Sequence, residues 1–525
     1  MNKILVILKL LLFFHVINSL KILINNPKFG FSHVNFFSHL SDILIDGGHD
    51  VTVLAIEMDN TVNHPGANKA KIYHVSGHPE AINLLSNKSK MHQMWETEDH
   101  ISSKINLFKD FSRGLDLTAN KVFDDKTLEE YMKSQNFDIG ISEWYTIYMF
   151  GLFKAWNIKT HISVSSVGFL SFNYEQFGMP FASSFIPNAI QMSTDKMTYL
   201  ERVENLIGHL LIKSFISKRN DKTFLHEKFE KKYGKNFFNG YTALGDTCYF
   251  FANSNPFFDI PIPKPPKVID ISGIGIEEPK KLDKYWDNIL SLKRKTILIS
   301  FGSVAKSSLM PQKMKNNIIE VVKKFSNVTF IWKYETPEDG IGKNIDNLIL
   351  SKWIPQYDLL NDERLSLFIT HGGINSCNEI VYSGKVALSI PIFGDQFKNS
   401  KLLEKRRMGI SMNKKLINDK SILEKNIYEL LENDEYKRNA KLISRMIKNN
   451  PVNSKETLLK HIEFCGTFGN NSFLDLESRN MGVIVFYNLD IIIPFIILLT
   501  LLIIIILWYI TKTIKKIFKI KRKID

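Results

Sequence analysis

The stretch 367–379 places polar residues after a glycine turn, as phosphate sites do. The apolar run 367–370 predicts a strand, His371-Gly372-Gly373 a turn that brings backbone close to a ligand, and the residues from 374 onward a helix. The first turn of a helix offers unpaired N–H groups and the positive end of the helix dipole, and both suit phosphate. Asn375 and Glu379 lie one turn apart on the same face. A nucleotide laid along that face would place its ribose diol against the Glu379 carboxylate.

Two flanking stretches supply groups for the rest of a nucleotide ligand. Trp353 follows the predicted strand 348–351, where its indole can stack on a base while Gln356 bonds the base edge. Asp395 and Gln396 follow a glycine at the start of another predicted helix and suit bidentate hydrogen bonds with vicinal hydroxyls. Taken singly, these features can also be a core tryptophan, an ordinary glycine turn and a capping aspartate. Together they predict a nucleotide site with room for a sugar.

His33 is a candidate general base near the amino terminus. It lies at the start of the first predicted helix, beside the first predicted strand. An imidazole with an unperturbed pKa of about 6.5 suits proton transfer at neutral pH. The neighbouring helix N-terminus disfavours the imidazolium and keeps the ring available. Position by itself favours a surface histidine beside a helix cap, so it does not assign the role.

The first half of the chain alternates strands and helices. A strand at 21–25, a helix at 34–45 and a strand at 49–56 form a βαβ unit, which implies a parallel sheet. Further pieces of this sheet are predicted at 137–143, 160–166 and 248–254, with a helix at 145–156. Residues 175–240 are rich in aromatic side chains and mostly helical in pattern, so they could build a pocket for an apolar acceptor.

A second alternation follows a proline-rich boundary. Residues 259–267 (DIPIPKPPK) hold four prolines, which stop helices. Beyond them, strands are predicted at 296–300, 328–333, 348–351, 367–370 and 386–391, with a Gly302-Ser303 turn and a helix at 311–325. Two α/β halves of this kind form a cleft, and ligands of open parallel sheets bind beyond the carboxyl ends of the strands. The predicted fold class is therefore α/β, with domains at 20–270 and 280–465.

The two ends of the chain carry membrane signals. Residues 1–19 combine lysines with an apolar run, and this pattern predicts a cleaved secretory signal peptide. Residues 491–510 hold no charge and are long enough to span a hydrocarbon core of about 30 Å. Residues 511–525 hold seven basic side chains and one acid, so the positive-inside rule predicts a cytosolic tail and a lumenal body. This is the topology of a single-pass type I membrane protein.

The net charge of +14 over 525 residues is therefore mainly topogenic, because much of it belongs to the leader and the tail. A nucleic-acid partner is accordingly not predicted. The tail ends Lys521-Arg522-Lys523-Ile524-Asp525. Lysines three and five places from the terminus resemble retrieval signals of the endoplasmic reticulum, although a basic tail could also serve only as a topology anchor.

Cysteines and glycosylation triplets add weaker expectations. Three cysteines, at positions 248, 377 and 465, permit at most one bridge, and we expect free thiols. Asn87, Asn327 and Asn470 each begin a glycosylation triplet, and Asn327 is the weakest because it opens a predicted strand.

Three ordered motifs carry a family resemblance. Trp353-Ile-Pro-Gln356, His371-Gly-Gly-Ile-Asn-Ser-Cys-Asn-Glu379 and Pro391-Ile-Phe-Gly-Asp395-Gln396 resemble the donor signature of UDP-glycosyltransferases, specifically the UDP-glucuronosyltransferases. The similarity covers nearly the whole chain, including Phe31-Ser-His-Val-Asn35 and Ile299-Ser-Phe-Gly-Ser303, and several stretches look most like nematode members. It implies a GT-B fold, in which two Rossmann-like domains face a cleft, the first binding the acceptor and the second the UDP-sugar.

The resemblance also implies roles for individual residues. Trp353 and Gln356 would hold uracil, Glu379 the ribose, and Asp395 with Gln396 the sugar. The diphosphate would meet the residues of two glycine turns and the helix start: Ser303, His371, Gly373, Asn375 and Ser376. Ser376 falls where some members have glycine, and adds a donor to phosphate.

The implied chemistry is an inverting transfer of glucuronic acid or glucose from a UDP-sugar to small lipophilic acceptors. His33 would be the base, and Glu143 occupies the position of the family's orienting aspartate, one methylene longer. Asp138 is a fallback partner, although it lies at the start of its strand. No metal site or cofactor is predicted, the UDP-sugar being a co-substrate, and association into a homo-oligomer is left open.

Two other functions are weighed against this one. A membrane-anchored protein that binds UDP-sugars or lipids without catalysis is suggested by Glu143 alone. A nicotinamide-dependent enzyme is excluded, because the first strand is followed by Asn25-Asn-Pro-Lys-Phe-Gly30 instead of a Gly-x-Gly-x-x-Gly turn.

Overall fold

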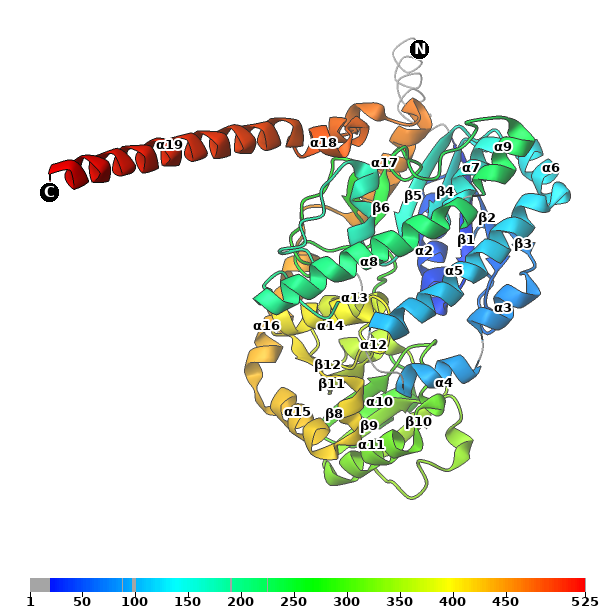
Figure 1. Cartoon of the computed structure of the whole chain (residues 1–525). Helices are drawn as coiled ribbons and strands as arrows, with labels where there is room; N and C mark the ends of the chain where they lie inside the picture. The colour runs from blue at the N-terminus through cyan, green and yellow to red at the C-terminus, as the bar shows by residue number, and fades with distance from the viewer. Residues whose placement is uncertain (1–18, 87, 97–100, 189–190, 224, 525) are drawn as a thin grey trace, which may run out of the picture.

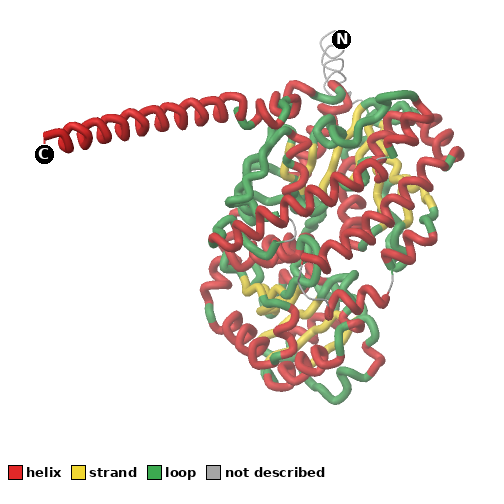
Figure 2. Tube along the Cα trace, in the orientation of Figure 1, coloured by secondary structure: helices red, strands yellow, loops and turns green. Residues whose placement is uncertain are grey.

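The computed structural model describes residues 19–524, apart from 87, 97–100, 189–190 and 224. The predicted signal peptide, but for its last residue, and Asn87 lie outside the described residues. Two bodies of strands enclosed by helices lie one beyond the other, and a long helix projects from the upper body (Figures 1 and 2).

The first body is built on a parallel sheet. In the described part of the chain it has seven strands in the order β3-β2-β1-β4-β5-β6-β7. They are β1 (Lys21–Lys28), β2 (Asp50–Glu57), β3 (Lys71–Val75), β4 (Ile139–Glu143), β5 (Thr160–Ser165), β6 (Phe250–Ala252) and β7 (Val268–Asp270). Ile22 and Ile24 of β1 pack on one face and Leu23 on the other, so apolar runs are buried on both sides.

Helices cover both faces of this sheet (Figure 2). They are α2 (Phe31–Asp46), α3 (Pro79–Leu85), α5 (Ile101–Asp124), α6 (Lys126–Gln135), α7 (Tyr148–Ala155), α8 (Tyr199–Thr223) and α9 (His226–Tyr233). Helix α4 (Lys88–Glu96) lies instead against the second body, where its Trp95 packs on Phe301. Helix α2 buries Val34, Phe37, Leu40 and Leu44 at helical spacing. It begins three residues earlier than predicted, directly after Gly30, whose φ of 68° lets the chain turn into the helix.

The second body is also a parallel α/β unit. Its described strands form a six-stranded sheet in the order β10-β9-β8-β11-β12-β13. They are β8 (Lys295–Ser300), β9 (Val328–Lys333), β10 (Leu348–Ser351), β11 (Leu365–Thr370), β12 (Ala387–Ser389) and β13 (Gly409–Ser411). The helices are α10 (Lys284–Leu290), α11 (Gln312–Lys324), α12 (Gln356–Asn361), α13 (Ile374–Ser383), α14 (Gln396–Lys405), α15 (Lys420–Glu432) and α16 (Asp434–Lys448). The predicted fold class is confirmed.

The chain then returns to the first body. Helix α17 (Ser454–Phe468) buries Leu458, Ile462 and Cys465 in the same core as Ile22 of β1. A short helix α18 (Val483–Phe486) precedes α19 (Leu489–Ile524). Residues 489–519 of α19 are apolar enough, over a sufficient length, to cross a membrane, which fits the predicted anchor.

One sequence expectation needs correction. Cys248 and Cys465 form a disulfide, with free Cys377 buried, so the expectation of free thiols was wrong for two of the three cysteines. The partners are 217 residues apart and meet only because α17 packs against the first sheet. In residues 175–240, the helical pattern is confirmed by α8 and α9, which turns and loops connect to the rest of the first body.

Candidate functional site

A cleft of about 550 Å³ lies between the two bodies, at the carboxyl ends of their strands. Phe31 and His33 line it from the first body. All ten predicted donor-site residues line it from the second: Ser303, Trp353, Gln356, His371, Gly373, Asn375, Ser376, Glu379, Asp395 and Gln396. Residues separated by up to 93 positions in the sequence are thus brought to one wall, because β8, β10, β11 and β12 all end there.

The glycine turn after β11 is shaped by close packing. Gly372 has a φ of 79°, and a Cβ there would lie 2.6 Å from Oγ of Ser389. A side chain at this position would therefore push the turn out of place. Gly373 is the N-cap of α13, so the helix presents its amino-terminal end to the cleft.

His371 is held as a neutral imidazole. Burial, together with the nearby Lys333 cation, lowers its pKa to about 4. A Cβ added to Gly302, whose φ is 80°, would lie 2.7 Å from His371 Nε2, so the two glycine turns meet across this ring. The ring can donate one hydrogen bond without adding a positive charge.

Glu379 and Gln356 form a polar pair one turn inside α13. Nε2 of Gln356 donates to Oε2 of Glu379 and, at 3.3 Å, to Oγ of Ser376. Burial raises the pKa of Glu379 to about 7, against the stabilising effect of the Gln356 hydrogen bond. This carboxyl group therefore changes its ionisation near neutral pH.

Trp353 presents its indole to solvent at the cleft. Its side chain is 62% exposed, which is unusual for so large an apolar group. The Phe31 ring contacts it edge-on at a centroid distance of 5.5 Å, and Nζ of Lys333 lies 5.2 Å from its ring centroid. One face is thus supported while the ring stays accessible to a flat ligand.

Asp395 and Gln396 are partly committed to the protein. Oδ2 of Asp395 accepts a hydrogen bond of 2.7 Å from Asn399, and burial raises the pKa of Asp395. Oε1 of Gln396 accepts the backbone N–H groups of Ile392 and Phe393, at 2.9 and 3.0 Å. The Gln396 carboxamide therefore has its nitrogen left for a ligand. Asn399, which also donates to Gly372 O at 3.0 Å, was not predicted from the sequence.

Asn375 links the two bodies. Its Nδ2 donates to the carbonyl of Ser32, at 3.1 Å, directly beside His33. This contact brings the start of α13 against the start of α2, so the predicted base and the predicted phosphate site share one corner of the cleft.

His33 reaches Glu143 through a third residue. Its Nδ1 lies 2.6 Å from Oγ of Ser166 and 3.8 Å from Oε2 of Glu143. The backbone N–H of Ser166 donates to Oε1 of Glu143 at 3.2 Å. Glu143 is fully buried and its Oε2 has no hydrogen-bond partner among the described residues. Asp138 instead accepts the backbone N–H of Lys21, at 2.7 Å, at the opposite end of the sheet.

Aromatic rings surround His33 on the first body. Phe29 and Tyr145 have ring centroids 6.4 Å from the imidazole, and Phe111 contacts both rings at 5.0 and 5.3 Å. These residues come from the end of β1, the helix α5 and the loop after β4. Sequence reasoning did not find them, because no local pattern connects three single aromatics so far apart.

The comparison with known families shows to which family the chain belongs. The family model described as "UDP-glucoronosyl and UDP-glucosyl transferase" matches residues 21–524. The chain belongs to this UDP-glycosyltransferase family. The resemblance seen in the three sequence motifs is thereby confirmed, and transfer of a sugar from a UDP-sugar is the activity that the family supports.

Relatives and solved structures agree with this membership. The ugt-46 protein of Caenorhabditis elegans, provisionally named a UDP-glucuronosyltransferase, is 30% identical over 91% of this glycosyltransferase and 90% of the relative. The similarly named ugt-47 protein of Caenorhabditis briggsae is 28% identical over 93% and 92% of the two chains. A UDP-glucosyltransferase from Polygonum tinctorium shares the fold, with a TM-score of 0.58 and 14% identity over 86% of this chain and 99% of that one. The glycotransferase of kitacinnamycin gives a TM-score of 0.55 at 13% identity, over 85% and 99%.

Ser166 is the main residue of this glycosyltransferase's site that sequence reasoning missed. It follows β5 directly and lies next to the end of β4, where Glu143 ends its strand. A signal was present, because a polar residue at the carboxyl end of a strand adjacent to a candidate acid lies at the cleft edge of a parallel sheet.

Proposed function

We propose that the chain transfers glucose or glucuronic acid from a UDP-sugar to small lipophilic acceptors, with inversion and with His33 as general base. The observation that carries the proposal is that His33 and the donor motif line the same cleft. Family membership supports the UDP-sugar, and the geometry around His33 supports the base.

The donor would lie along the second body. Uracil stacks on the accessible face of Trp353 and is bonded by Gln356, while the ribose diol donates to the carboxylate of Glu379. The diphosphate faces the amino-terminal end of α13, where the helix dipole and free N–H groups stabilise negative charge. Asp395 and the Gln396 carboxamide then bond the sugar hydroxyls.

The transfer is a single displacement. With Nδ1 directed at Ser166, Nε2 of neutral His33 takes the proton from an acceptor hydroxyl, amine or thiol. The acceptor atom forms a bond to the anomeric carbon from the face opposite UDP, and the bond from that carbon to the phosphate oxygen breaks. UDP leaves as an anion held by α13, and the buried Glu143 carboxylate stabilises the imidazolium.

The aromatic rings around His33 support an apolar acceptor. Phe29 lines the cleft next to the proposed base, with Phe111 and Tyr145 behind it, and this apolar surface favours flat, lipophilic molecules over sugars or peptides. The proposed setting is the lumenal side of the endoplasmic reticulum membrane, with α19 as anchor and the basic tail in the cytosol.

One observation favours a second candidate, a binding protein without transfer. Nδ1 of His33 is 3.8 Å from Glu143, beyond hydrogen-bond distance, so the base lacks a direct acidic partner. The same experiment separates the two. Purified full-length protein is incubated with UDP-glucose or UDP-glucuronic acid and a panel of phenols, and products are measured by mass spectrometry beside donor binding by calorimetry. Conjugated phenols are expected, whereas donor binding without any product would support the second candidate.

A further inference from the structure

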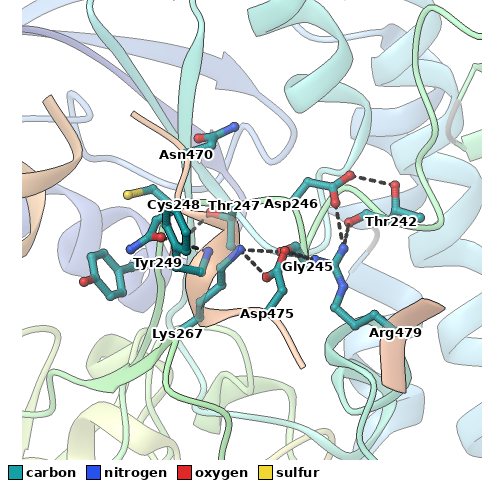
Figure 3. Close-up of polar contacts among 12 residues, drawn as sticks. Thr242, Gly245, Asp246, Thr247, Cys248, Tyr249, Lys267, Asn470, Asp475 and Arg479 are labelled. Atoms are coloured by element: carbon teal, nitrogen blue, oxygen red, sulfur yellow. Dashed lines mark hydrogen bonds and ion pairs between the residues drawn. The ribbon is translucent and has the colours of Figure 1, made fainter. Parts of the chain in front are cut away.

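The segment between α17 and α18, residues 469–481, lies against the first body as a continuous strap. It contains two short turns of 3₁₀ helix, Ser472–Leu474 and Glu477–Asn480, and its Leu474 packs against the core that holds α17. Figure 3 shows Asp475 and Arg479 of this strap directed at Asp246, Gly245 and Lys267 of the first body. A segment that only tethered a membrane anchor would need none of these contacts.

Arg479 is the most heavily bonded residue of the strap. Its side chain is 12% exposed, and its guanidinium pairs with Asp246 at 2.6 Å and with Asp475 at 2.8 Å. It also donates to the carbonyl of Gly245 at 2.9 Å. Two carboxylates and a carbonyl therefore accept the hydrogen bonds of the Arg479 guanidinium. Charge-assisted hydrogen bonds of this kind are stronger than those between neutral groups.

Lys267 adds a buried cation under the strap. Its side chain is 2% exposed, and Nζ lies 2.5 Å from Asp475 and 3.0 Å from the Gly245 carbonyl. A buried ammonium without a carboxylate partner is strongly unfavourable, so the first body requires Asp475 to stay in place. Asp475 thus bridges Lys267 of the body and Arg479 of the strap (Figure 3).

Two glycines of the first body make room for the strap. A Cβ on Gly178 would lie 2.6 Å from the backbone nitrogen of Arg479 and 2.7 Å from Oγ of Ser478. Ser478 donates to the carbonyl of Gly178 at 2.6 Å. A Cβ on Gly245 would lie 2.5 Å from the Arg479 guanidinium. The surface of the body is therefore fitted to this segment at the level of single atoms.

The strap is attached at the amino ends of the strands, opposite the cleft. Its first end is fixed by Asn470, whose Oδ1 accepts the N–H of His161 at 3.2 Å, and by the Cys248–Cys465 disulfide just before it. His161, Cys248 and Lys267 all lie at or just before the amino ends of β5, β6 and β7. The cleft lies at the carboxyl ends of the strands, so strap and cleft are at opposite ends of the first body.

Beyond the strap, the chain exposes apolar side chains before it enters α19. Val483 and Ile484 of α18 are 68% and 60% exposed, and α19 starts five residues after Ile484. An apolar helix this close to a membrane span reaches the headgroup region, where such side chains are stable.

From these contacts we infer that the strap docks the acceptor-side body onto the bilayer surface. Helix α18 lies in the membrane interface, the amino ends of β5–β7 face the lipid, and the cleft opens away from it. The first body then keeps a fixed orientation relative to the membrane, and the second body is the part that moves when the cleft closes. This arrangement is independent of the sugar or acceptor used.

The first test asks whether the strap is docked in the membrane-inserted chain. Gly178→Ala is made in full-length protein reconstituted into phosphatidylcholine vesicles, and trypsin cleavage after Arg479 is followed by mass spectrometry. Gly340→Ala is the matched control, because Gly340 has a similar positive φ of 84° but no atom within 4 Å of an added Cβ. Gly178→Ala should be cut at least about tenfold faster than wild type and Gly340→Ala. Equal rates for all three would overturn the proposal.

A second pair of variants covers the case that Gly178→Ala does not fold. Asp475→Asn removes both ion pairs, while Glu477→Gln makes the same charge change at an exposed strap position. Faster cleavage in Asp475→Asn alone supports docking. Cleavage of the wild-type strap as rapid as in Asp475→Asn would refute it.

The lipid contact is tested by thiol accessibility. Ile484→Cys is compared with Tyr428→Cys, an exposed position on α15 in the second body, since the native free thiol Cys377 is buried. In vesicles, Ile484→Cys should react with a lipid-soluble maleimide and not with a charged one, whereas Tyr428→Cys should react with both. If the charged reagent reacted with both variants at the same rate, α18 would be in water and the proposal would be wrong.

Discussion

Nδ1 of His33 lies 2.6 Å from Oγ of Ser166, and this contact, not a direct pair with Glu143, orients the imidazole. Glu143 has one methylene more than the aspartate that the family resemblance implies, and its carboxylate accepts the N–H of Ser166. The negative charge therefore acts on the ring through Ser166 and across 3.8 Å. Under the proposed mechanism, three residues and not two share the handling of the proton.

Loss of the imidazole should reduce turnover without loss of donor binding. His33→Ala is expected to lower kcat for phenolic acceptors by about 10²- to 10⁴-fold, which is the range of general-base catalysis. UDP affinity should stay within about twofold, because His33 stands on the first body and the donor residues on the second. Steady-state kinetics with calorimetry of UDP binding checks both, and unchanged turnover would remove His33 from the mechanism.

Ser166 should act as a positioning residue. Ser166→Ala removes one hydrogen bond to Nδ1, worth about 0.5–1.5 kcal/mol, so kcat should fall by about 2- to 12-fold and the pH optimum should shift. Ser163→Ala, on the strand β5 that precedes Ser166, is the control, since the buried hydroxyl of Ser163 has no hydrogen-bond partner among the described residues. Equal kinetics of the two variants would mean that the Ser166 contact has no catalytic effect.

Donor affinity should depend on pH through Glu379. Burial raises the pKa of Glu379 to about 7, and the ionised form is the one that accepts two ribose hydroxyls. The ionised fraction rises from roughly one tenth at pH 6 to nine tenths at pH 8, so the Kd for UDP-glucose should fall by up to about tenfold over that range.

The control for this pH profile is Glu379→Gln. This variant should bind UDP-glucose more weakly, and its Kd should not change with pH. UDP-glucose is the ligand because its diphosphate does not ionise in this range, and His371 stays neutral because its pKa is lowered to about 4. Measurement in the His33→Ala background prevents turnover and removes a second imidazole of the cleft. His39 also lines the cleft, and burial lowers its pKa. An unchanged slope in Glu379→Gln would assign the titration to another group.

Trp353 should contribute to binding and not to stability. Trp353→Ala is expected to weaken UDP binding by about 1–3 kcal/mol, the usual contribution of stacking between a base and an aromatic ring. The free energy of unfolding should change by less than about 0.5 kcal/mol, because the side chain is 62% exposed. The UDP affinity of Trp353→Phe should lie between those of wild type and Trp353→Ala. A large loss of stability in Trp353→Ala would instead indicate a packing role.

Local and contiguous features were predictable from the sequence. The βαβ unit and the turn of His371 follow from periodicity and glycine placement, and Asn375 with Glu379 share a helix face as expected. The donor residues were found because each sits in a short motif at the end of its own strand. Strand ends converge in any parallel sheet, so their meeting required no further information.

Features set by tertiary packing were not predictable. The contacts of Phe111 with Phe29 and Tyr145, and the strap contacts of Arg479, join positions that no sequence period relates. Helix α17 is the clearest case, because only its return to the first body places Cys465 beside Cys248. An odd count of cysteines argued for free thiols, and the packing of one helix reversed that expectation.

The Cys248–Cys465 bridge should stabilise the first body. Cys248→Ser is expected to lower the free energy of unfolding by about 2–5 kcal/mol, because the bridge closes a long loop of 217 residues. Cys465→Ser and the double variant should cost the same amount, since each removes the same bridge. In thermal unfolding, wild type should lose stability on addition of a reductant and the variants should not. A wild-type melting temperature that is insensitive to reductant, together with a free thiol count of three, would contradict the bridge; a count of one would support it and place the body in an oxidising compartment.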